Sequence, residues 1–173
     1  FLYRGKLPSS RPLIAAGIVM IVSAALALDQ LRSTSVNLLL SVLGIVWLSD
    51  TAAYFAGKAF GRRKLAPRIS PGKTWEGVVA AMLAVAAYAC TVIWIVPDVV
   101  HPVWVPDPVM LPVLGFWLLL AGLGIMGHLF ESMLKRNAGV KDSGALLPGH
   151  GGMLDRIDAV MPVLPLAAIF YSG

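Results

Sequence analysis

The strongest constraint on this chain is a series of long apolar stretches that carry almost no charge. Each of the first four is long enough to cross about 30 Å of hydrocarbon as an α-helix rising about 1.5 Å per residue. The five stretches are Pro12–Leu28, Asn37–Gly57, Trp75–Val96, Val109–Phe130 and the shorter Ala159–Ser172. This pattern predicts an all-α, polytopic helical membrane protein with about five transmembrane helices.

Composition supports a membrane environment and a single domain. The 173 residues are 58% hydrophobic and only 13% charged, with a mean hydropathy of +0.79, which is too apolar for an ordinary soluble domain. No internal repeat is visible, so we expect one membrane-embedded domain over residues 1–173. Because the sequence starts at Phe1 and stops inside an apolar run, we also expect it to be part of a longer protein that has a further N-terminal region.

The distribution of Lys and Arg predicts the orientation of the helices. The segment before the first stretch has three of these residues, Lys58–Thr74 has six and Ser132–Asp158 has four, whereas Asp29–Val36 has one and Pro97–Pro108 has none. Positive loops stay on the cytoplasmic side, so the basic segments predict a site facing the cytoplasm, in a bacterial inner membrane. A net charge of +5 that lies on one membrane face favours anionic lipid or a phosphorylated substrate over nucleic acid.

Asp50 is a carboxylate inside the second apolar stretch. Insertion of such a charge costs about 3 kcal/mol, so we expect the side chain to face a wet cavity or an ionic partner. A structural ion pair between helices is the alternative to a functional role. Glycines are concentrated in the fourth stretch, where we expect them to allow close helix packing; they are Gly115, Gly122, Gly124 and Gly127.

The run Ser70-Pro71-Gly72-Lys73-Thr74 leads directly into the third stretch. Thr74 is a plausible helix N-cap, and Glu76 lies in the first turn, where negative charge is favourable. Unpaired N–H groups at this helix start, with Lys73 beside them, predict a phosphate-binding cradle. The candidate substrate-binding residues are Ser70, Lys73, Thr74 and Glu76. A solvated positive loop is the alternative for the remaining cations of this segment.

The last polar segment, Ser132–Asp158, contains the densest set of reactive side chains. His128, Glu131 and Lys135 share one helical face by their spacing. Asp155 and Asp158 are three residues apart at the start of the fifth predicted helix, and two carboxylates on one face suit Mg²⁺. Helix capping by these aspartates, with a glycine-rich turn before them, is the ordinary alternative.

The same segment resembles the signature of the phosphatidate cytidylyltransferases, or CDP-diacylglycerol synthases. The matching residues are Ser132, Lys135, Arg136, Lys141, Asp142, Gly144, Pro148, His150, Gly151, Gly152, Asp155, Arg156, Ile157 and Asp158. The runs Asp50–Tyr54, Gly57-Lys58 and Ser70–Thr74 are similar to earlier stretches of that family. The resemblance implies transfer of CMP from CTP to phosphatidate, which gives CDP-diacylglycerol and pyrophosphate in phospholipid biosynthesis.

The resemblance also implies roles for individual residues. Catalytic roles fall to Lys135, Arg136, Lys141 and Asp142, and further substrate-binding roles to Ser132, His150, Gly151, Gly152 and Arg156. The implied metal ligands are Asp155, Asp158, Asp50 and His128. The implied cofactor is Mg²⁺, alone or with a second cation, and the implied partners are CTP, phosphatidate and membrane lipids, with a homodimer as a further expectation.

His128 departs from the family's pattern. The family usually has an acid directly after the glycine that corresponds to Gly127, and that acid is thought to help hold the metal. Imidazole suits zinc and transition metals better than Mg²⁺. One alternative is therefore a catalytically impaired family member. Another is a small cation- or proton-coupled transporter with Asp50 and His128 in its path.

Overall fold

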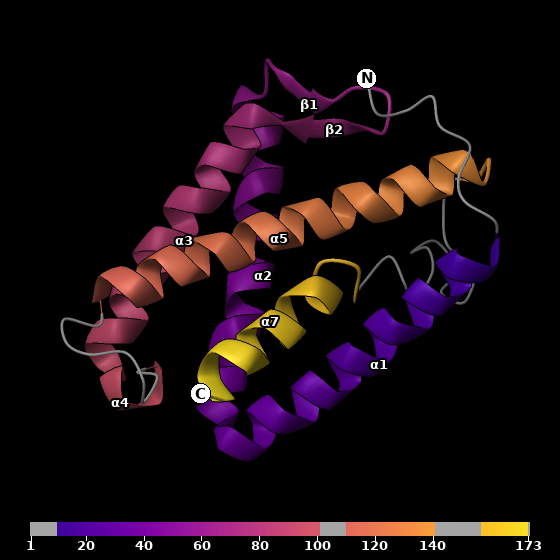
Figure 1. The fold of residues 1–173 in the computed structure, drawn as a ribbon. Coiled ribbons are helices and arrows are strands. Elements are labelled where there is room, and N and C mark those ends of the chain that lie inside the picture. The colour runs from indigo at the N-terminus through magenta and orange to yellow at the C-terminus, as the bar shows by residue number, and fades with distance from the viewer. Residues whose placement is uncertain (1–9, 101–109, 141–156, 173) are drawn as a thin grey trace, which may run out of the picture.

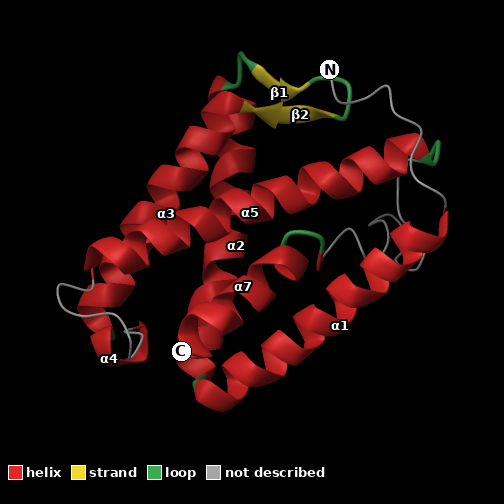
Figure 2. Cartoon of the chain, in the orientation of Figure 1, coloured by secondary structure: helices red, strands yellow, loops and turns green. Residues whose placement is uncertain are grey.

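The computed structural model describes residues 10–100, 110–140 and 157–172, which form a helical bundle with a small hairpin at one end (Figures 1 and 2). Four helices in the described part of the chain are long and apolar enough to cross a membrane. This confirms the prediction of an all-α, polytopic membrane protein. The elements are α1 Ser10–Thr34, α2 Val36–Phe60, β1 Lys64–Ala66, β2 Ser70–Thr74, α3 Trp75–Ile95, α4 Pro97–Val100, α5 Met110–Asn137 and α7 Val160–Ser172.

The four long helices correspond to the first four predicted spans, and two of them extend well beyond the predicted ends. Helix α1 continues to Thr34, and only Ser35 separates it from α2. Ser35 caps the start of α2, because its Oγ accepts a 3.4 Å hydrogen bond from the Leu38 N–H. Helix α5 continues to Asn137, so its last two turns carry polar side chains. The fifth predicted span corresponds to α7, a shorter apolar helix.

Helices α2 and α3 pack along one another through a stripe of mostly small residues. The buried residues of α3 recur every fourth position, and they are Gly77, Ala81, Val85, Ala89 and Ile93. Positions four apart lie on one helical face, and small side chains there let the two backbones approach closely. At the first of these positions, a Cβ atom on Gly77 would lie 2.8 Å from the Ala53 carbonyl oxygen of α2.

Helices α5, α7 and α1 form the other side of the bundle. Helix α5 crosses α2 and α3 obliquely, and α7 lies between α5 and α1 (Figure 1). Trp117 of α5 is fully buried, and its Nε1 donates a 2.9 Å hydrogen bond to the Tyr171 hydroxyl of α7. The predicted close packing of the α5 glycines is confirmed at Gly127, which faces Asp158 and Pro162. A Cβ atom on Gly122 or Gly124 would meet its nearest neighbour at an ordinary 3.8 Å, and Gly115 faces open space.

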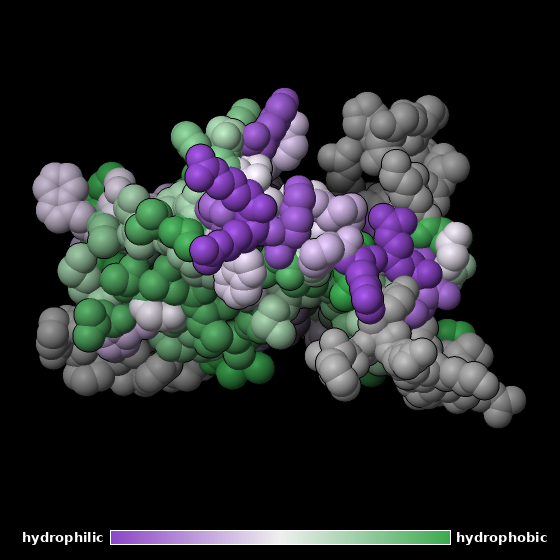
Figure 3. Space-filling view, turned by 90° about the horizontal axis from the view of Figure 1, so that it is seen from above, coloured by the Kyte–Doolittle hydropathy of each residue, from purple (hydrophilic) through white to green (hydrophobic). Residues whose placement is uncertain are grey.

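The hairpin of β1 and β2 is an element that the sequence analysis did not predict. The strands are antiparallel, with Lys64 opposite Thr74 and Ala66 opposite Ser70, so β2 has extra residues in a bulge. The Trp75 N–H donates to the Arg63 carbonyl at 2.9 Å, which fastens the hairpin to the start of α3. Seen from the hairpin end, hydrophilic side chains gather on this face, whereas the helices beside it are mostly hydrophobic (Figure 3).

Candidate functional site

Three ionisable side chains from distant parts of the chain meet at the hairpin end of the bundle. Asp50 lies in α2, His128 in α5 and Asp158 in the turn before α7. His128 Nδ1 lies 2.6 Å from Asp158 Oδ2, and His128 Nε2 lies 2.9 and 3.0 Å from the two Asp50 carboxylate oxygens. The imidazole therefore bridges two carboxylates. Asp50 does have the ionic partner expected of a charge inside an apolar stretch.

Burial increases across this bridge from Asp50 to Asp158. The Asp50 side chain is 39% exposed, that of His128 is 20% exposed and that of Asp158 is 4% exposed. Carboxylates only accept hydrogen bonds, so a doubly protonated ring satisfies both of them, whereas a neutral ring can donate to only one. The Asp50 end of the bridge is the end that a solvent-borne ligand can reach.

Asp158 is fixed by several neighbours. Its Oδ1 accepts a 2.7 Å hydrogen bond from the Ala159 N–H, within the turn that precedes α7. Burial alone would raise the pKa of the Asp158 carboxyl, but hydrogen bonding with His128 and Glu131 outweighs burial and holds this pKa below its usual value. Glu131 is itself buried, and its Oε2 lies 3.3 Å from Lys135 Nζ. Glu131 and Lys135 therefore do share one face of α5, as predicted.

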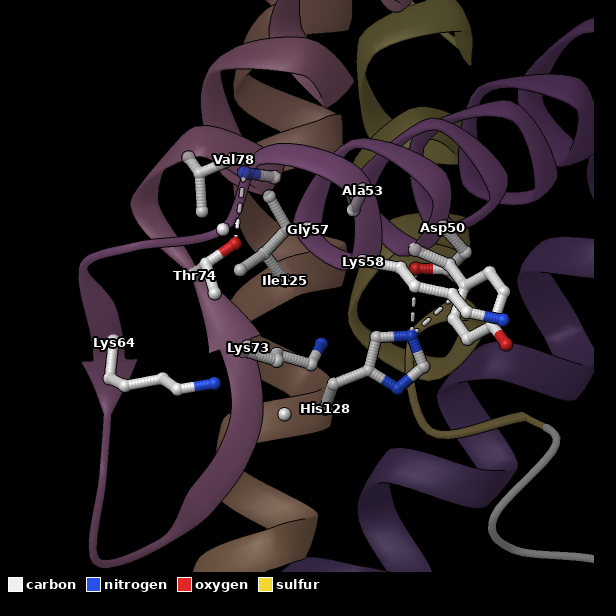
Figure 4. Close-up of a pocket in the computed structure, with 14 residues that line it drawn as sticks. Asp50, Ala53, Gly57, Lys58, Lys64, Lys73, Thr74, Val78, Ile125 and His128 are labelled. Atoms are coloured by element: carbon white, nitrogen blue, oxygen red, sulfur yellow. Dashed lines mark hydrogen bonds and ion pairs between the residues drawn. The ribbon is translucent and has the colours of Figure 1, made fainter.

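A pocket of about 660 Å³ opens beside the bridge, between α2, α3, α5 and the hairpin. Its Asp, Lys and His lining residues among those described are Asp50, Lys58, Lys64, Lys73 and His128. Apolar side chains, including Val78 and Ile125, complete the wall. Lys73 and Lys64 extend from the hairpin toward His128 (Figure 4). One wall of the pocket is thus cationic and another carries the histidine and the carboxylate of Asp50.

Lys73 is the most enclosed of the three lysines, since it is half-buried whereas Lys58 and Lys64 are exposed. Burial lowers the pKa of the Lys73 ammonium below its ordinary value of 10.5, and the negative charges of Asp50 and Asp158 act in the opposite direction. An ammonium group in partial isolation from water gains more from an anionic ligand than a fully solvated one does.

The start of α3 differs from the predicted phosphate cradle. The predicted N-cap is confirmed, because Thr74 Oγ1 accepts a 3.2 Å hydrogen bond from the Gly77 N–H. The Trp75 N–H is taken by the Arg63 carbonyl. Two of the N–H groups at the helix start are therefore already satisfied by the protein. Glu76 accepts hydrogen bonds from the Arg63 N–H at 3.1 and 3.2 Å, and it lines a separate surface pocket with Arg62.

The remaining predicted site residues fall into two groups. Ser70 begins β2, opposite Ala66. Ser132, Lys135 and Arg136 lie in the last turns of α5, and Arg136 Nε donates a 3.4 Å hydrogen bond to the Ile69 carbonyl of the hairpin turn. Other predicted residues lie outside the described part of the chain; they are Lys141, Asp142, His150, Gly151, Gly152, Asp155 and Arg156.

The pocket also contains residues that the sequence analysis did not select. Lys58 lies in the last turn of α2, with its Nζ 5.9 Å from the centre of the Tyr54 ring, and Lys64 begins β1. Both lysines belong to a segment whose cations are common in any cytoplasmic loop. The signal that could have identified Lys58 is its place one helical turn after Tyr54 and two turns after Asp50, on the same face of α2.

The carboxylates of the donor set suit Mg²⁺ singly rather than together, because the His128 ring lies between Asp50 and Asp158. Asp50 and Asp158 offer hard oxygen ligands, and Mg²⁺ commonly binds one or two carboxylates together with substrate phosphates. Among the described residues, no group of three or more His, Cys, Asp or Glu side chains is arranged to hold a metal ion. Both ring nitrogens of His128 already contact carboxylates.

Comparison with known proteins identifies the family. Residues 9–172 match the model of the cytidylyltransferase family, which is nearly the whole chain. The chain belongs to the cytidylyltransferase family. The predicted resemblance is thereby confirmed at the level of the family, and it covers the helices and hairpin that form the pocket.

Curated cytidylyltransferases with high similarity come from several bacteria. The phosphatidate cytidylyltransferase of Haemophilus influenzae is 44% identical over 137 residues, which are 78% of this chain and 45% of that protein. Those of Pseudomonas aeruginosa and Thermotoga maritima are each 43% identical, over 79% and 77% of this chain and 48% of each relative. The chain thus spans about half the length of the curated cytidylyltransferases it matches.

Proposed function

We propose that this chain forms the catalytic part of a phosphatidate cytidylyltransferase, which transfers CMP from CTP to phosphatidate. Two lines of support converge. The curated relatives named above carry this activity in their names. The observation that carries the proposal for this chain is the pocket, in which the Asp50 carboxylate and the His128 imidazole share one cavity with three lysines at the end of a membrane bundle.

The chemistry is a single displacement at phosphorus. An oxygen of the phosphatidate phosphate forms a bond to the α-phosphorus of CTP, and the bond from that phosphorus to the bridging oxygen of the β-phosphate breaks. The products are CDP-diacylglycerol and pyrophosphate. No covalent enzyme intermediate is required, so the protein contributes mainly by positioning the two substrates and by stabilising the charge that develops.

The pocket residues suit these tasks. Lys73 supplies positive charge beside the reacting phosphates, and its partial burial strengthens that interaction. Asp50, whose carboxylate faces the pocket, would hold Mg²⁺ together with substrate phosphates, and Asp155 and Asp158 are the further ligands that the family resemblance implies. When bound, Mg²⁺ supplies neutralisation of phosphate charge. His128 holds Asp50 and Asp158 in fixed positions through its two ring nitrogens.

The lysines and arginines of the predicted signature would complete the site from the end of α5 and the segment that follows. Lys135, Arg136, Lys141 and Asp142 would orient CTP and neutralise the leaving group. Ser132, His150, Gly151, Gly152 and Arg156 would contact the nucleotide or the lipid phosphate, and Ser70, Thr74 and Glu76 would shape the hairpin side. These assignments carry the family resemblance over to individual residues of this chain, and those between 141 and 156 lie outside the described residues.

The site's location at one end of the bundle suits a reaction between a lipid and a nucleotide. We place this end at the cytoplasmic face of a bacterial inner membrane, because the basic loops gather there. A lipid phosphate can then approach from the bilayer while CTP arrives from the cytoplasm. The family relationship favours this reaction over ion or proton transport through Asp50 and His128.

The test is pyrophosphate release by the purified full-length protein in detergent with CTP and phosphatidate. We expect release that requires both substrates and Mg²⁺. No release from the natural protein and none from a His128→Asp variant would refute nucleotidyl transfer.

The second candidate is a catalytically impaired member, favoured by the contact of both ring nitrogens of His128 with carboxylates. No pyrophosphate release from the natural protein, with release restored in the His128→Asp variant, would identify a catalytically impaired member.

A further inference from the structure

We infer that Lys58 and Lys64, together with Lys73, form a subsite for the two terminal phosphates of the nucleotide, and hence for the pyrophosphate that leaves. This inference rests on the proposed function and assigns one part of its substrate to the lysines that border the pocket. The shared chemistry is recognition of a phosphate anion, which a nucleotide or a lipid headgroup could supply. The structure favours the nucleotide.

The three lysines reach one pocket from three different elements. Lys58 comes from the end of α2, Lys64 from β1 and Lys73 from β2, and all three line the same space. Lys64 and Lys73 extend from the hairpin toward His128 (Figure 4). Lys58 lies 5.9 Å from the centre of the Tyr54 ring, so its stem is directed along α2 by an aromatic contact. Cations therefore border the pocket from more than one side.

The irregular pairing of the hairpin explains how two lysines on opposite strands serve one pocket. Successive residues of a regular strand point to opposite faces. Here the register shifts between Lys64 and Ala66, and Gly72, Lys73 and Thr74 of β2 all line the pocket. A bulge of this kind redirects a side chain that regular pairing would point away. The hairpin thus presents Lys64 and Lys73 together.

The charge balance of the pocket is suited to a polyanion. Three lysines line the pocket against one described aspartate, Asp50. Arg68 at the hairpin turn is exposed as well, but it is not among the described residues that line the pocket, whereas Lys58 and Lys64 are. Pyrophosphate carries several negative charges on two adjacent phosphates, so spaced ammonium groups bind it better than they bind a single phosphate ester.

Exposure decides between the two phosphate sources. Lys58 and Lys64 are exposed, whereas Lys73 is half-buried and interacts electrostatically with Asp50, Asp158 and His128. The reacting α-phosphate needs the enclosed end, near Lys73 and Asp50. The leaving pyrophosphate is soluble in water and must depart along an aqueous route. The exposed lysines border that route, so we assign them to the terminal phosphates.

The experiment measures binding without turnover. The affinity of the purified full-length protein for inorganic pyrophosphate is determined by calorimetry in detergent with Mg²⁺, without CTP or phosphatidate. We expect Lys58→Gln and Lys64→Gln each to weaken binding by about tenfold, because each removes one charge-assisted contact. Lys64→Arg should retain most of the affinity. The matched control is Arg68→Gln, which removes an exposed hairpin cation that is not among the described residues lining the pocket, and it should leave the affinity unchanged.

A kinetic arm separates the two phosphate sources. Lys58→Gln and Lys64→Gln should raise the KM for CTP by about tenfold and leave the KM for phosphatidate, presented in mixed micelles, unchanged. A rise confined to phosphatidate would overturn the inference and assign the lysines to the lipid headgroup. Pyrophosphate affinity that is absent in the natural protein, or equal in the natural and Lys→Gln proteins, would also overturn it.

These outcomes also distinguish the subsite from the reaction. Pyrophosphate binding that depends on Lys58 and Lys64, with no CMP transfer under any condition, would retain the subsite and refute the proposed function. CMP transfer together with a pyrophosphate affinity that neither Lys→Gln substitution changes would support the proposed function and refute the subsite. Both residues are exposed, so replacement by Gln should leave the fold intact, and size-exclusion profiles check this for each variant.

Discussion

Gly127 lies so close to the turn before α7 that a Cβ atom built on it would be 2.5 Å from the carbonyl oxygen of Asp158. The same atom would be 3.0 Å from Cγ of Pro162. Contact at 2.5 Å with a backbone atom requires the backbone to shift. The glycine next to His128 is therefore needed for Asp158 to approach the imidazole.

Gly127→Ala should destabilise the fold and reduce activity. Forcing a methyl group into a tight helix contact costs about 1–3 kcal/mol, and here the displaced group carries the Asp158 carboxylate. Thermal unfolding in detergent and pyrophosphate release measure the two effects. Gly115→Ala is the matched control, since it lies in the same helix with no atom within 4 Å of its Cβ position. Equal unfolding temperatures for both variants would contradict the packing explanation.

Asp50→Asn should remove most transfer activity and leave the protein folded. The substitution keeps the shape of the side chain but removes the negative charge that faces the pocket and His128. We expect a fall of roughly 100-fold in kcat, the scale of losing one charged group at a reacting centre. Asp29→Asn, an exposed aspartate of α1, is the control. An Asp50→Asn protein with near-natural kcat would remove Asp50 from the mechanism.

Lys73 should make CTP binding sensitive to alkaline pH. The ammonium group is charged below its pKa, and burial lowers the pKa of Lys73 from 10.5. Affinity for CTP should therefore be full at lower pH and decline as pH rises, starting below the range of an ordinary lysine. A Lys73→Arg variant stays charged throughout and should flatten the profile. Identical profiles for the two proteins would exclude Lys73 as the titrating group.

Glu76 should act by holding the hairpin rather than by touching substrate. Its carboxylate accepts from the Arg63 N–H, so Glu76→Ala should speed hydrogen exchange at that amide by roughly threefold, as expected for an exposed hydrogen bond. Mass spectrometry of peptides covering residues 61–74 measures this. Arg62→Gln, which leaves the Arg63 amide bonded, should change neither exchange nor activity. Unchanged exchange in Glu76→Ala would show that the carboxylate does not fasten the hairpin.

The helices were predictable because their signal is local and strong. Continuous apolar runs in α2, α3 and α5 admit little besides a membrane helix. The hairpin was not predictable on the same basis. Strand β1 has only three residues, and β2 contains Pro71 and Gly72, which are residues that weaken or interrupt strands. Its pairing depends on its attachment to α3 through Arg63, which no local pattern reveals.

The sequence allowed most residues of the site to be selected, but not the contacts among them. Asp50, Lys73, His128 and Asp158 were all selected from depth, spacing or resemblance. Asp50 and His128 are 78 positions apart in the chain, and only the oblique crossing of α5 over α2 brings them into contact. Lys64 was overlooked because a pocket cation and a solvated loop cation look alike in a basic segment.

The number of residues between the hairpin and the small-residue stripe of α3 determines which way Lys73 points. The stripe begins at Gly77, three residues after Thr74, where the hairpin ends. One inserted residue between them would rotate the hairpin by about 100° relative to the face that packs on α2. Lys73 would then point away from His128 although every side chain remained present. Evolution of this region is therefore limited to exchange of residue types, since insertions and deletions would misalign two walls of one cavity.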